Sequence, residues 1–344
     1  MTPPDTTRMR REIDEIPDAV ERLLSQGGAA CAEAAATARG FDPAFLISVA
    51  RGSSDHVCTY LKYVSELVLG LPVASVGPSV ASVYGGRLRL SRALCLAVSQ
   101  SGRSPDLVAL TRSVGHNGAL TVAITNDPAS PLARAAGRVL DIHAGPERSV
   151  AATKTFVTSA VAGLAFIAAW AGNDDLRAAL HTLPERLRLA VGIDWPELRA
   201  EIGTRPSLFT IGRGPAWAIS AEAALKFKET CRLHAESHSS AEILHGPVSI
   251  VEEGFPVLGF AAADAAEEGL AEVADRIAEM GAKVFVTSGR CRRAERLEHV
   301  RTGHPLTDPL ALIVSFYAMV ERLARQRGIN PDLPRNLRKV TETV

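Results

Sequence analysis

Residues 93–106 read ALCLAVSQSGRSPD, a run of six apolar residues that leads into a serine-rich loop. A short apolar run bounded by polar turn residues is typical of a strand that is buried on both faces. After it, Ser104 is a good N-cap, Pro105 suits the first helical position, and Asp106 suits the first helical turn. The stretch therefore predicts a strand, a tight loop and a helix in succession, the repeating element of a parallel α/β sheet.

The same alternation continues on both sides of this stretch. The remaining elements expected in the first half are strands at 44–50, 71–76, 119–124 and 138–142, helices at 55–69 and 105–116, and a long apolar helix at 153–170. Helices that separate fully apolar strands indicate a parallel sheet covered on both faces. A helix is also expected from residue 1 to about residue 25.

The pattern restarts after a charged, helical connection at 172–205. The elements expected there are strands at 208–211, 255–260, 282–286 and near Leu306, and helices at 216–233, 265–280 and 310–327. FLISVARGSS from Phe45 parallels SLFTIGRGPA from Ser207, so we predict one unit used twice. The predicted fold class is α/β, with two doubly wound parallel-sheet domains and a basic C-terminal tail. The predicted boundaries are 1–28 (N-terminal helix), 29–172 (first domain), 173–204 (connection), 205–328 (second domain) and 329–344 (tail).

Composition excludes several classes of protein. The 344 residues carry 38 basic and 38 acidic side chains, which argues against nucleic acid as a main partner. The five cysteines are scattered without a CxxC pair, which fits a reducing compartment and predicts neither a disulfide framework nor a zinc knuckle. The N-terminus lacks the apolar core of a signal peptide, and the apolar run 156–171 is shorter than the roughly 18 residues of a membrane span. We therefore expect a cytoplasmic protein with no membrane partner.

Two loops at strand ends have the composition of a phosphate site. The first combines three hydroxyls and an amide (Ser99, Gln100, Ser101 and Ser104) with Gly102 and the start of a helix. The second, RGSS at 51–54, follows an earlier strand of the same sheet. Ser54 alone is better explained by ordinary helix capping, but two serine-rich loops at equivalent strand ends favour phosphate binding. The second half has Asp264, Glu267 and Glu268 at the matching place, where acids would repel a dianion, so we expect one phosphate site per chain. The fingerprints of nucleotide-binding loops are absent.

A segment rich in acids and histidines, 221–247, is the candidate for proton transfer. Glu222, Lys226 and Glu229 fall on one helix face, where the first two are expected to form a surface ion pair or to help hold Glu229. His245 precedes Gly-Pro in a rigid turn that suits a positioned side chain. A zinc site from the three histidines 234, 238 and 245 is the weaker interpretation, because HAESH does not have the HExxH spacing.

Four separate motifs carry a family resemblance that extends from about residue 40 to the end of the chain. They are SQSG at 99–102, AATKTF at 151–156, the segment from Ala221 through HGP at 245–247, and PRNLRK at 334–339. With them the chain resembles proteins with tandem sugar isomerase (SIS) domains. It is most similar to the isomerase half of glutamine–fructose-6-phosphate aminotransferase, and it also resembles stand-alone glucosamine-6-phosphate deaminases.

The resemblance implies a phosphosugar site that needs no metal and no organic cofactor. It implies that Glu229 moves a proton between C1 and C2, that His245 opens the sugar ring from the neighbouring subunit, and that Lys339 covers the site. The residues implied to hold the phosphate are Ser54, Ser99, Gln100, Ser101 and Ser104. Those implied to line the sugar are Gly52, Ser53, Val150, Ala152 and Lys226. Ala152 stands where the synthase has Ser and Arg103 where it has Glu, which leaves the contacts to the open-chain sugar undecided.

The chain starts with Met1-Thr2, and fewer than fifty residues precede the first predicted strand, so we expect no glutaminase domain. The favoured reaction is then the conversion of glucosamine 6-phosphate to fructose 6-phosphate and ammonia. The alternatives are ketose–aldose isomerisation without loss of nitrogen and deglycation of a fructosamine 6-phosphate. An alternative of another class is a non-catalytic sugar-phosphate sensor, which would not need the acid–base residues. A shared site requires at least a dimer, and a two-fold homodimer is expected.

Overall fold

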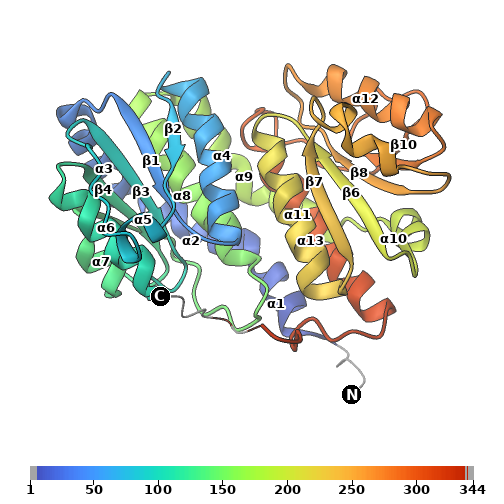
Figure 1. Ribbon diagram of the computed structural model, residues 1–344, viewed down its shortest axis with the longest axis horizontal. Helices are drawn as coiled ribbons and strands as arrows, with labels where there is room; N and C mark the ends of the chain where they lie inside the picture. Colours follow the sequence, from blue (N-terminus) through green and yellow to red (C-terminus); the bar gives the residue numbers. More distant parts are fainter. Residues whose placement is uncertain (1–5, 338, 340–344) are drawn as a thin grey trace. The chain divides into compact units, whose positions relative to one another are not determined.

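The computed structural model describes residues 6–337 and Lys339, and its internal contacts divide the chain into two compact units (Figure 1). The first-sheet unit comprises residues 18–147, 154–181 and Lys339. The second-sheet unit comprises residues 6–17, 148–153 and 182–337. Residues 1–5 of the predicted N-terminal helix, and Arg338 and residues 340–344 of the predicted basic tail, lie outside the described residues.

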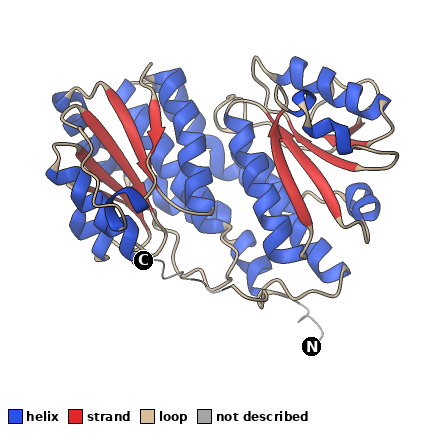
Figure 2. Ribbon diagram, viewed as in Figure 1, coloured by secondary structure: helices blue, strands red, loops and turns tan. Residues whose placement is uncertain are grey.

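The first-sheet unit is built on five parallel strands in the order β2-β1-β3-β4-β5. The strands are β1 (Phe45–Val49), β2 (Val73–Ser75), β3 (Ala93–Val98), β4 (Leu120–Thr125) and β5 (Arg138–Asp141). The helices are α2 (Ile16–Gln26), α3 (Gly28–Phe41), α4 (Ser53–Val68), α5 (Ser79–Ser82), α6 (Pro105–His116), α7 (Pro131–Ala135) and α8 (Lys154–Ala171). Helices lie on both sides of the sheet (Figure 2), which explains why all six residues of β3 are buried.

The second-sheet unit repeats this plan with the order β10-β9-β8-β6-β7, again all parallel. Its strands are β6 (Ser207–Gly212), β7 (His234–Ser239), β8 (Pro256–Phe260), β9 (Lys283–Val286) and β10 (Glu295–Arg296). Its helices are α1 (Arg8–Asp14), α10 (Pro196–Ile202), α11 (Pro215–Cys231), the short η1 (Ile243–His245) and η2 (Pro247–Ile250), α12 (Glu267–Glu279) and α13 (Asp308–Gln326). The chain passes from the first-sheet unit to the second along α9 (Asp174–Gly192).

The two sheets confirm the predicted duplication. Renumbered from the first strand of each unit, both have the order 2-1-3-4-5 of a doubly wound sheet. The turns after the equivalent strands β1 and β6 also match, because Gly52 has φ 56° and ψ −133° while Gly214 has φ 56° and ψ −135°. Only glycine adopts this conformation at little cost, so both positions need it.

Most predicted elements are confirmed to within two residues, and the differences have physical causes. The strand expected near Leu306 is wrong: Leu306 lies in the turns before α13, and the fifth strand is β10, two exposed residues long. The other elements that were not predicted are α5, α7, η1 and η2, which are at most five residues long, and two longer ones. The strand β7 is a polar run at a sheet edge, and α3 is an alanine-rich helix with little amphipathic pattern. In the described part of the predicted leading helix, the structure has two helices, α1 and α2, rather than one.

Helix α8 is apolar and long enough to cross a membrane by length and composition, and it is the one described helix of which this holds. However, 78% of it is buried inside the protein. It packs on α3 and α4, and Gly163 lets Leu61 of α4 approach so closely that a Cβ there would lie 2.4 Å from a Leu61 methyl. These contacts are those of a core helix.

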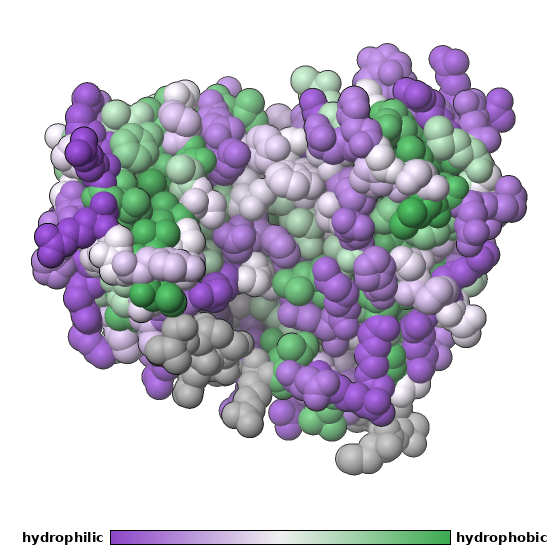
Figure 3. Space-filling view, viewed as in Figure 1, coloured by the Kyte–Doolittle hydropathy of each residue, from purple (hydrophilic) through white to green (hydrophobic). Residues whose placement is uncertain are grey.

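Hydrophilic side chains cover much of the face shown in Figure 3, with smaller apolar areas between them. Among the described residues, the large apolar side chains that are more than half exposed include Leu67, Val83, Tyr84 and Ile250. Val83 and Tyr84 are neighbours in the chain, and Ile250 ends the turn that follows His245.

Candidate functional site

The first sheet has its topological switch point between β1 and β3, where the strand order reverses. Ligands of doubly wound sheets bind in the crevice outside the carboxyl ends of the strands at such a point. The loops that follow these two strands are 50–54 and 99–104, the two loops that the sequence suggested for phosphate. Strands β1 and β3 are direct neighbours, so the structure brings Gly52, Ser53 and Ser54 to the same sheet edge as the SQSG loop.

The SQSG loop is held in shape by its own side chains and by the neighbouring turn. The backbone N–H of Gly102 donates to Ser99 Oγ at 3.2 Å, and that of Arg103 donates to Ser101 Oγ at 3.3 Å. Gly102 has φ 61°, and a Cβ there would lie 2.2 Å from Ser130 Oγ, so no other residue fits this position. Ser104 is the N-cap of α6, but its side chain makes no capping hydrogen bond, so the helix does not use this hydroxyl as its cap.

An ion pair ties the two loops together, and the sequence alone did not reveal it. Arg51 donates from Nε to Asp106 Oδ2 at 2.6 Å, and its Nη2 also contacts that oxygen. The Asp106 side chain is fully buried in the first turn of α6, whereas Arg51 is about half exposed. The pair joins the end of β1 to the start of α6 and leaves part of the guanidinium facing solvent at the predicted phosphate position.

The tail residue Lys339 contacts the first-sheet unit at a buried carboxylate. Its Nζ donates to Glu147 Oε2 at 2.6 Å, and Thr155 donates to the same carboxylate from N and Oγ1 at 3.0 and 2.7 Å. Burial alone would raise the pKa of Glu147, but the Lys339 ammonium and the Thr155 bonds together lower it. Glu147, which the sequence analysis did not single out, therefore fixes the amine of Lys339.

The proton-transfer candidates of the second-sheet unit lie on α11. Lys226 is fully buried between two carboxylates: its Nζ is 3.2 Å from Glu222 Oε1 and donates a short hydrogen bond to Glu229 Oε2. Tyr317 of α13 donates to Glu222 Oε1 from the other side at 3.1 Å. The expectation of a surface pair between Glu222 and Lys226 is wrong, because both side chains are completely buried. Its alternative, that the pair holds Glu229, agrees with these contacts.

This arrangement leaves a single carboxylate accessible. The Glu229 side chain is 21% exposed, whereas those of Lys226 and Glu222 are inaccessible. Burial by itself lowers the pKa of Lys226, but the two carboxylates outweigh it and raise that pKa, so Lys226 stays an ammonium. A carboxylate held by a buried cation, with one edge open, is suited to accept and return a proton.

The remaining predicted residues are placed as follows. His245 ends η1 and is exposed, and within the described part of the chain no side-chain hydrogen bond or ion pair joins it to Glu229. Val150 and Ala152 are half-buried in the segment 148–153, whose amides at Arg148 and Ser149 donate to the Glu12 carboxylate. The described residues contain no group of three or more His, Cys, Asp and Glu side chains arranged to hold a metal ion.

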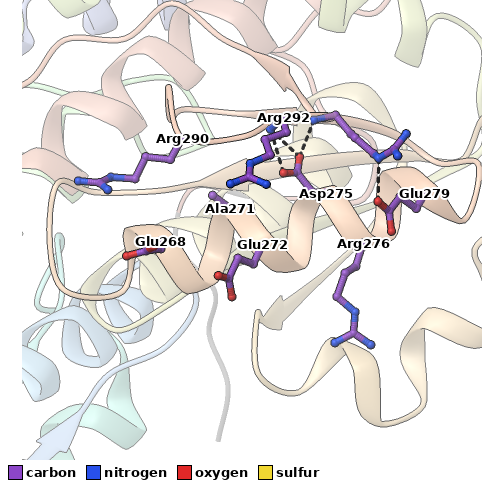
Figure 4. Close-up of a pocket in the computed structure, with 9 residues that line it drawn as sticks. Glu268, Ala271, Glu272, Asp275, Arg276, Glu279, Arg290 and Arg292 are labelled. Atoms are coloured by element: carbon purple, nitrogen blue, oxygen red, sulfur yellow. Dashed lines mark hydrogen bonds and ion pairs between the residues drawn. The ribbon is translucent and has the colours of Figure 1, made fainter.

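A charged hollow of about 850 Å³ on α12 contains none of the predicted site residues (Figure 4). Two of its carboxylates, those of Asp275 and Glu279, already have partners. Asp275 accepts the backbone N–H groups of residues 292–294, which lowers its pKa against the opposing effect of burial, and Arg293 pairs with Glu279 at 2.7 Å. This network anchors the loop that precedes β10.

Known proteins resemble this chain along most of its length. The model of the SIS domain matches residues 45–169 and 202–287, that is, both sheets. A glutamine–fructose-6-phosphate aminotransferase [isomerizing] of Pyrobaculum aerophilum is 31% identical over 332 residues, which cover 89% of this chain and 54% of that protein. The chain thus spans about half the length of the curated relatives it matches.

Two solved structures extend the comparison. A protein of Silicibacter pomeroyi DSS-3, described as a candidate phosphosugar isomerase, is 71% identical with a TM-score of 0.93, over 95% of this chain and 100% of the other. Glucosamine-6-phosphate deaminase of Thermotoga maritima is 17% identical with a TM-score of 0.78, over 98% and 100%, a similarity of fold alone. The chain therefore belongs to the SIS domain family, as a tandem pair of these domains, and is an enzyme of that family.

Proposed function

We propose that the protein is an amino-sugar 6-phosphate deaminase and isomerase that converts glucosamine 6-phosphate to fructose 6-phosphate and ammonia. The observation that carries the proposal is the carboxylate of Glu229, which the buried Lys226 holds with one edge open. The name of a relative, glutamine–fructose-6-phosphate aminotransferase, supports a six-carbon phosphosugar as substrate.

The loops at the first switch point would anchor the phosphate. Ser54, Ser99, Gln100, Ser101 and Ser104 offer hydroxyl and amide donors beside the N-terminal ends of α4 and α6. The half-exposed Arg51, whose charge is balanced by Asp106, adds guanidinium N–H donors there. The phosphate takes no part in the chemistry, but holding it orients C1 and C2 of the sugar, which is how remote binding energy lowers a barrier.

Glu229 would carry out the proton transfer. His245 protonates the ring oxygen as the pyranose opens to the aldehyde. The C1 hydroxyl loses its proton to solvent in this step. Glu229 then removes the proton on C2 while water donates a proton to O1, which gives an enolamine, and the carboxylic acid of Glu229 returns its proton to C1. The product is a C2 iminium with C1 as CH₂OH. Water adds at C2 and ammonia leaves, which gives the ketone of fructose 6-phosphate with no change in overall oxidation state.

Lys226 and Lys339 would support this step with charge. The Lys226 ammonium holds the Glu229 carboxylate in place through the ion pair on α11. Lys339, held at Glu147, would cover the sugar end. Val150, Ala152, Gly52 and Ser53 would line the sugar, and we propose no metal or organic cofactor.

Isomerisation without loss of nitrogen would use the same residues, so the two reactions are distinguished by their products. The test is to incubate the purified protein with glucosamine 6-phosphate, galactosamine 6-phosphate or fructose 6-phosphate and to measure ammonia and ketose phosphate separately. Ammonia and fructose 6-phosphate in equal amounts support the deaminase. If the protein interconverts aldose and ketose without releasing ammonia, it is an isomerase and not a deaminase. If it binds the sugar phosphate without forming any product, it is a sensor.

We also propose a homodimer whose subunits share the site. The exposed His245 has no side-chain partner within its own described chain, and the apolar Ile250 beside it is 56% exposed. Both observations suit a turn that packs on a second copy. A monomer that is fully active at nanomolar concentration would contradict this.

A further inference from the structure

The duplication gives the second sheet a switch point of its own, between β6 and β8. A hollow of about 420 Å³ opens there, lined by residues from the carboxyl ends of β6 and β7 and from the start of α12. The lining residues used below are Arg213, Ser240, Gly269, Leu270 and Val273. All of them belong to the second-sheet unit, so this hollow is complete within that unit.

The arginine of this hollow differs from its counterpart in the first sheet. Arg51 and Arg213 occupy the same place after equivalent strands, each followed by a glycine in the same conformation. Arg51 is neutralised by the buried Asp106. Arg213 is exposed, its Nη1 donates to Ser239 Oγ at 3.3 Å, and no carboxylate among the described residues pairs with it. One positive charge is therefore available at the second switch point.

A serine also lines this hollow and offers its hydroxyl to a ligand. Ser240 is only 4% exposed, and its backbone N–H donates to Gly212 O at 2.9 Å, which fixes it at the end of β6. Ser240 lines the hollow, and no side-chain hydrogen bond joins its hydroxyl to another residue of the described chain. The N-terminus of α12 also lies at the hollow, and its N-cap residue Ala266 has no side chain that could cap the helix.

The surrounding charges select the kind of anion. Glu267 accepts from Arg301 and Ser288, both at 2.8 Å, and lies 3.4 Å from Arg290. Asp264 accepts the N–H of Ala266, and burial, together with the nearby Glu267 and Asp308, raises its pKa. These acids are not part of the lining, but their field disfavours a phosphate dianion. A singly charged carboxylate matches the single guanidinium, which binds carboxylates through two parallel hydrogen bonds.

We propose that this switch-point hollow binds a small organic acid whose carboxylate pairs with Arg213 and accepts a hydrogen bond from Ser240. The short apolar body of the acid lies against Leu270 and Val273. This ligand site does not depend on the proposed reaction, and it gives the second sheet a ligand of a different charge class from that of the first.

The test is a titration with hexanoate, followed by NMR of labelled leucine and valine methyl groups in the full-length protein. We expect saturable binding at one site per chain, in the millimolar range or tighter, with shifts at Leu270 and Val273. Hexanol, which lacks the charge, should bind at least about tenfold more weakly, and so should hexyl phosphate.

Three variants keep the proposal falsifiable. Arg213→Gln should weaken hexanoate binding at least about tenfold, because the charge-assisted bonds are lost. Gly269→Leu should abolish binding without loss of thermal stability, because a Cβ there meets nothing within 4 Å and leucine favours the helix. Arg276→Gln, on the other hollow of α12, should change nothing.

Several results would overturn the proposal. They are no saturable binding of hexanoate, equal binding of hexanoate and hexanol, unchanged affinity in Arg213→Gln, or tighter Arg213-dependent binding of hexyl phosphate. The last of these would turn the site into a second phosphate site, which the nearby acids argue against.

Discussion

Replacing Lys226 by Met tests whether the α11 cluster is built around one buried cation. Lys226 and Glu222 are both fully buried, and their charged atoms lie 3.2 Å apart. Removing one partner of a buried pair leaves the other charge uncompensated, which costs about 3–5 kcal/mol of stability. This is a large fraction of the roughly 5–15 kcal/mol that stabilises a typical domain. Because the pKa of Lys226 is raised in the folded protein, the charged Lys226 stabilises the fold fully at pH 7. This stabilisation is lost only as the pH rises through the raised pKa.

Urea unfolding at pH 7 would measure the loss in Lys226→Met. Removing both charges in Glu222→Gln/Lys226→Met should recover most of it, because no lone buried charge then remains. Arg177→Met is the control for an ion pair at the surface: Arg177 lies 2.9 Å from Asp174 with both side chains at least half exposed, so the loss should be about 0–1 kcal/mol. If Lys226→Met costs no more than Arg177→Met, the reasoning is refuted.

Two further predictions concern the first-sheet unit. Gly102→Ala should destabilise by about 2–4 kcal/mol in thermal unfolding and abolish phosphosugar binding, because it adds a clash with Ser130 to the cost of a positive φ. Gly172→Ala, at φ 66° with free space around it, should cost only about 1–2 kcal/mol, and equal losses would refute the clash. The pKa of Glu147 is lower in the folded protein than in the unfolded chain, where it is near 4.3. The ionised Glu147 therefore stabilises the fold fully above pH 4.3, and this stabilisation is lost as the pH falls through the pKa of the folded state. The difference in unfolding free energy between wild type and Glu147→Gln should therefore shrink from pH 6 to pH 3, and a constant difference would contradict the assignment.

The fold could be predicted from the sequence because its strands are buried on both faces. A fully apolar run such as ALCLAV is stable as a strand only where helices cover both faces of the sheet. The observed strand β3 has the same first and last residues as the predicted one. The polar strand β7 could not be found in this way. It is an edge strand of the sequence HAESHS, paired on one side with β6, so its alternation of burial is weak.

The two loops that we propose for phosphate were placed correctly at strand ends, because local rules determine them: a strand end, an N-cap, a proline and a glycine. The contacts that hold the charged groups could not be predicted from the sequence, because they join residues that are far apart in the chain. Asp106 reaches Arg51 across 55 positions and Tyr317 reaches Glu222 across 95. The burial of Glu222 and Lys226 was missed for a related reason, since a charged i, i+4 pair on a helix is usually solvated.

The central claim is that Glu229 moves the C2 proton of an amino-sugar phosphate, and one measurement tests it most directly. Glu229→Gln keeps the size of the side chain and removes the base. The account predicts that this variant binds glucosamine 6-phosphate with nearly wild-type affinity and releases neither ammonia nor fructose 6-phosphate, a loss of at least about a hundredfold in kcat. Turnover at the wild-type rate in Glu229→Gln would contradict the account.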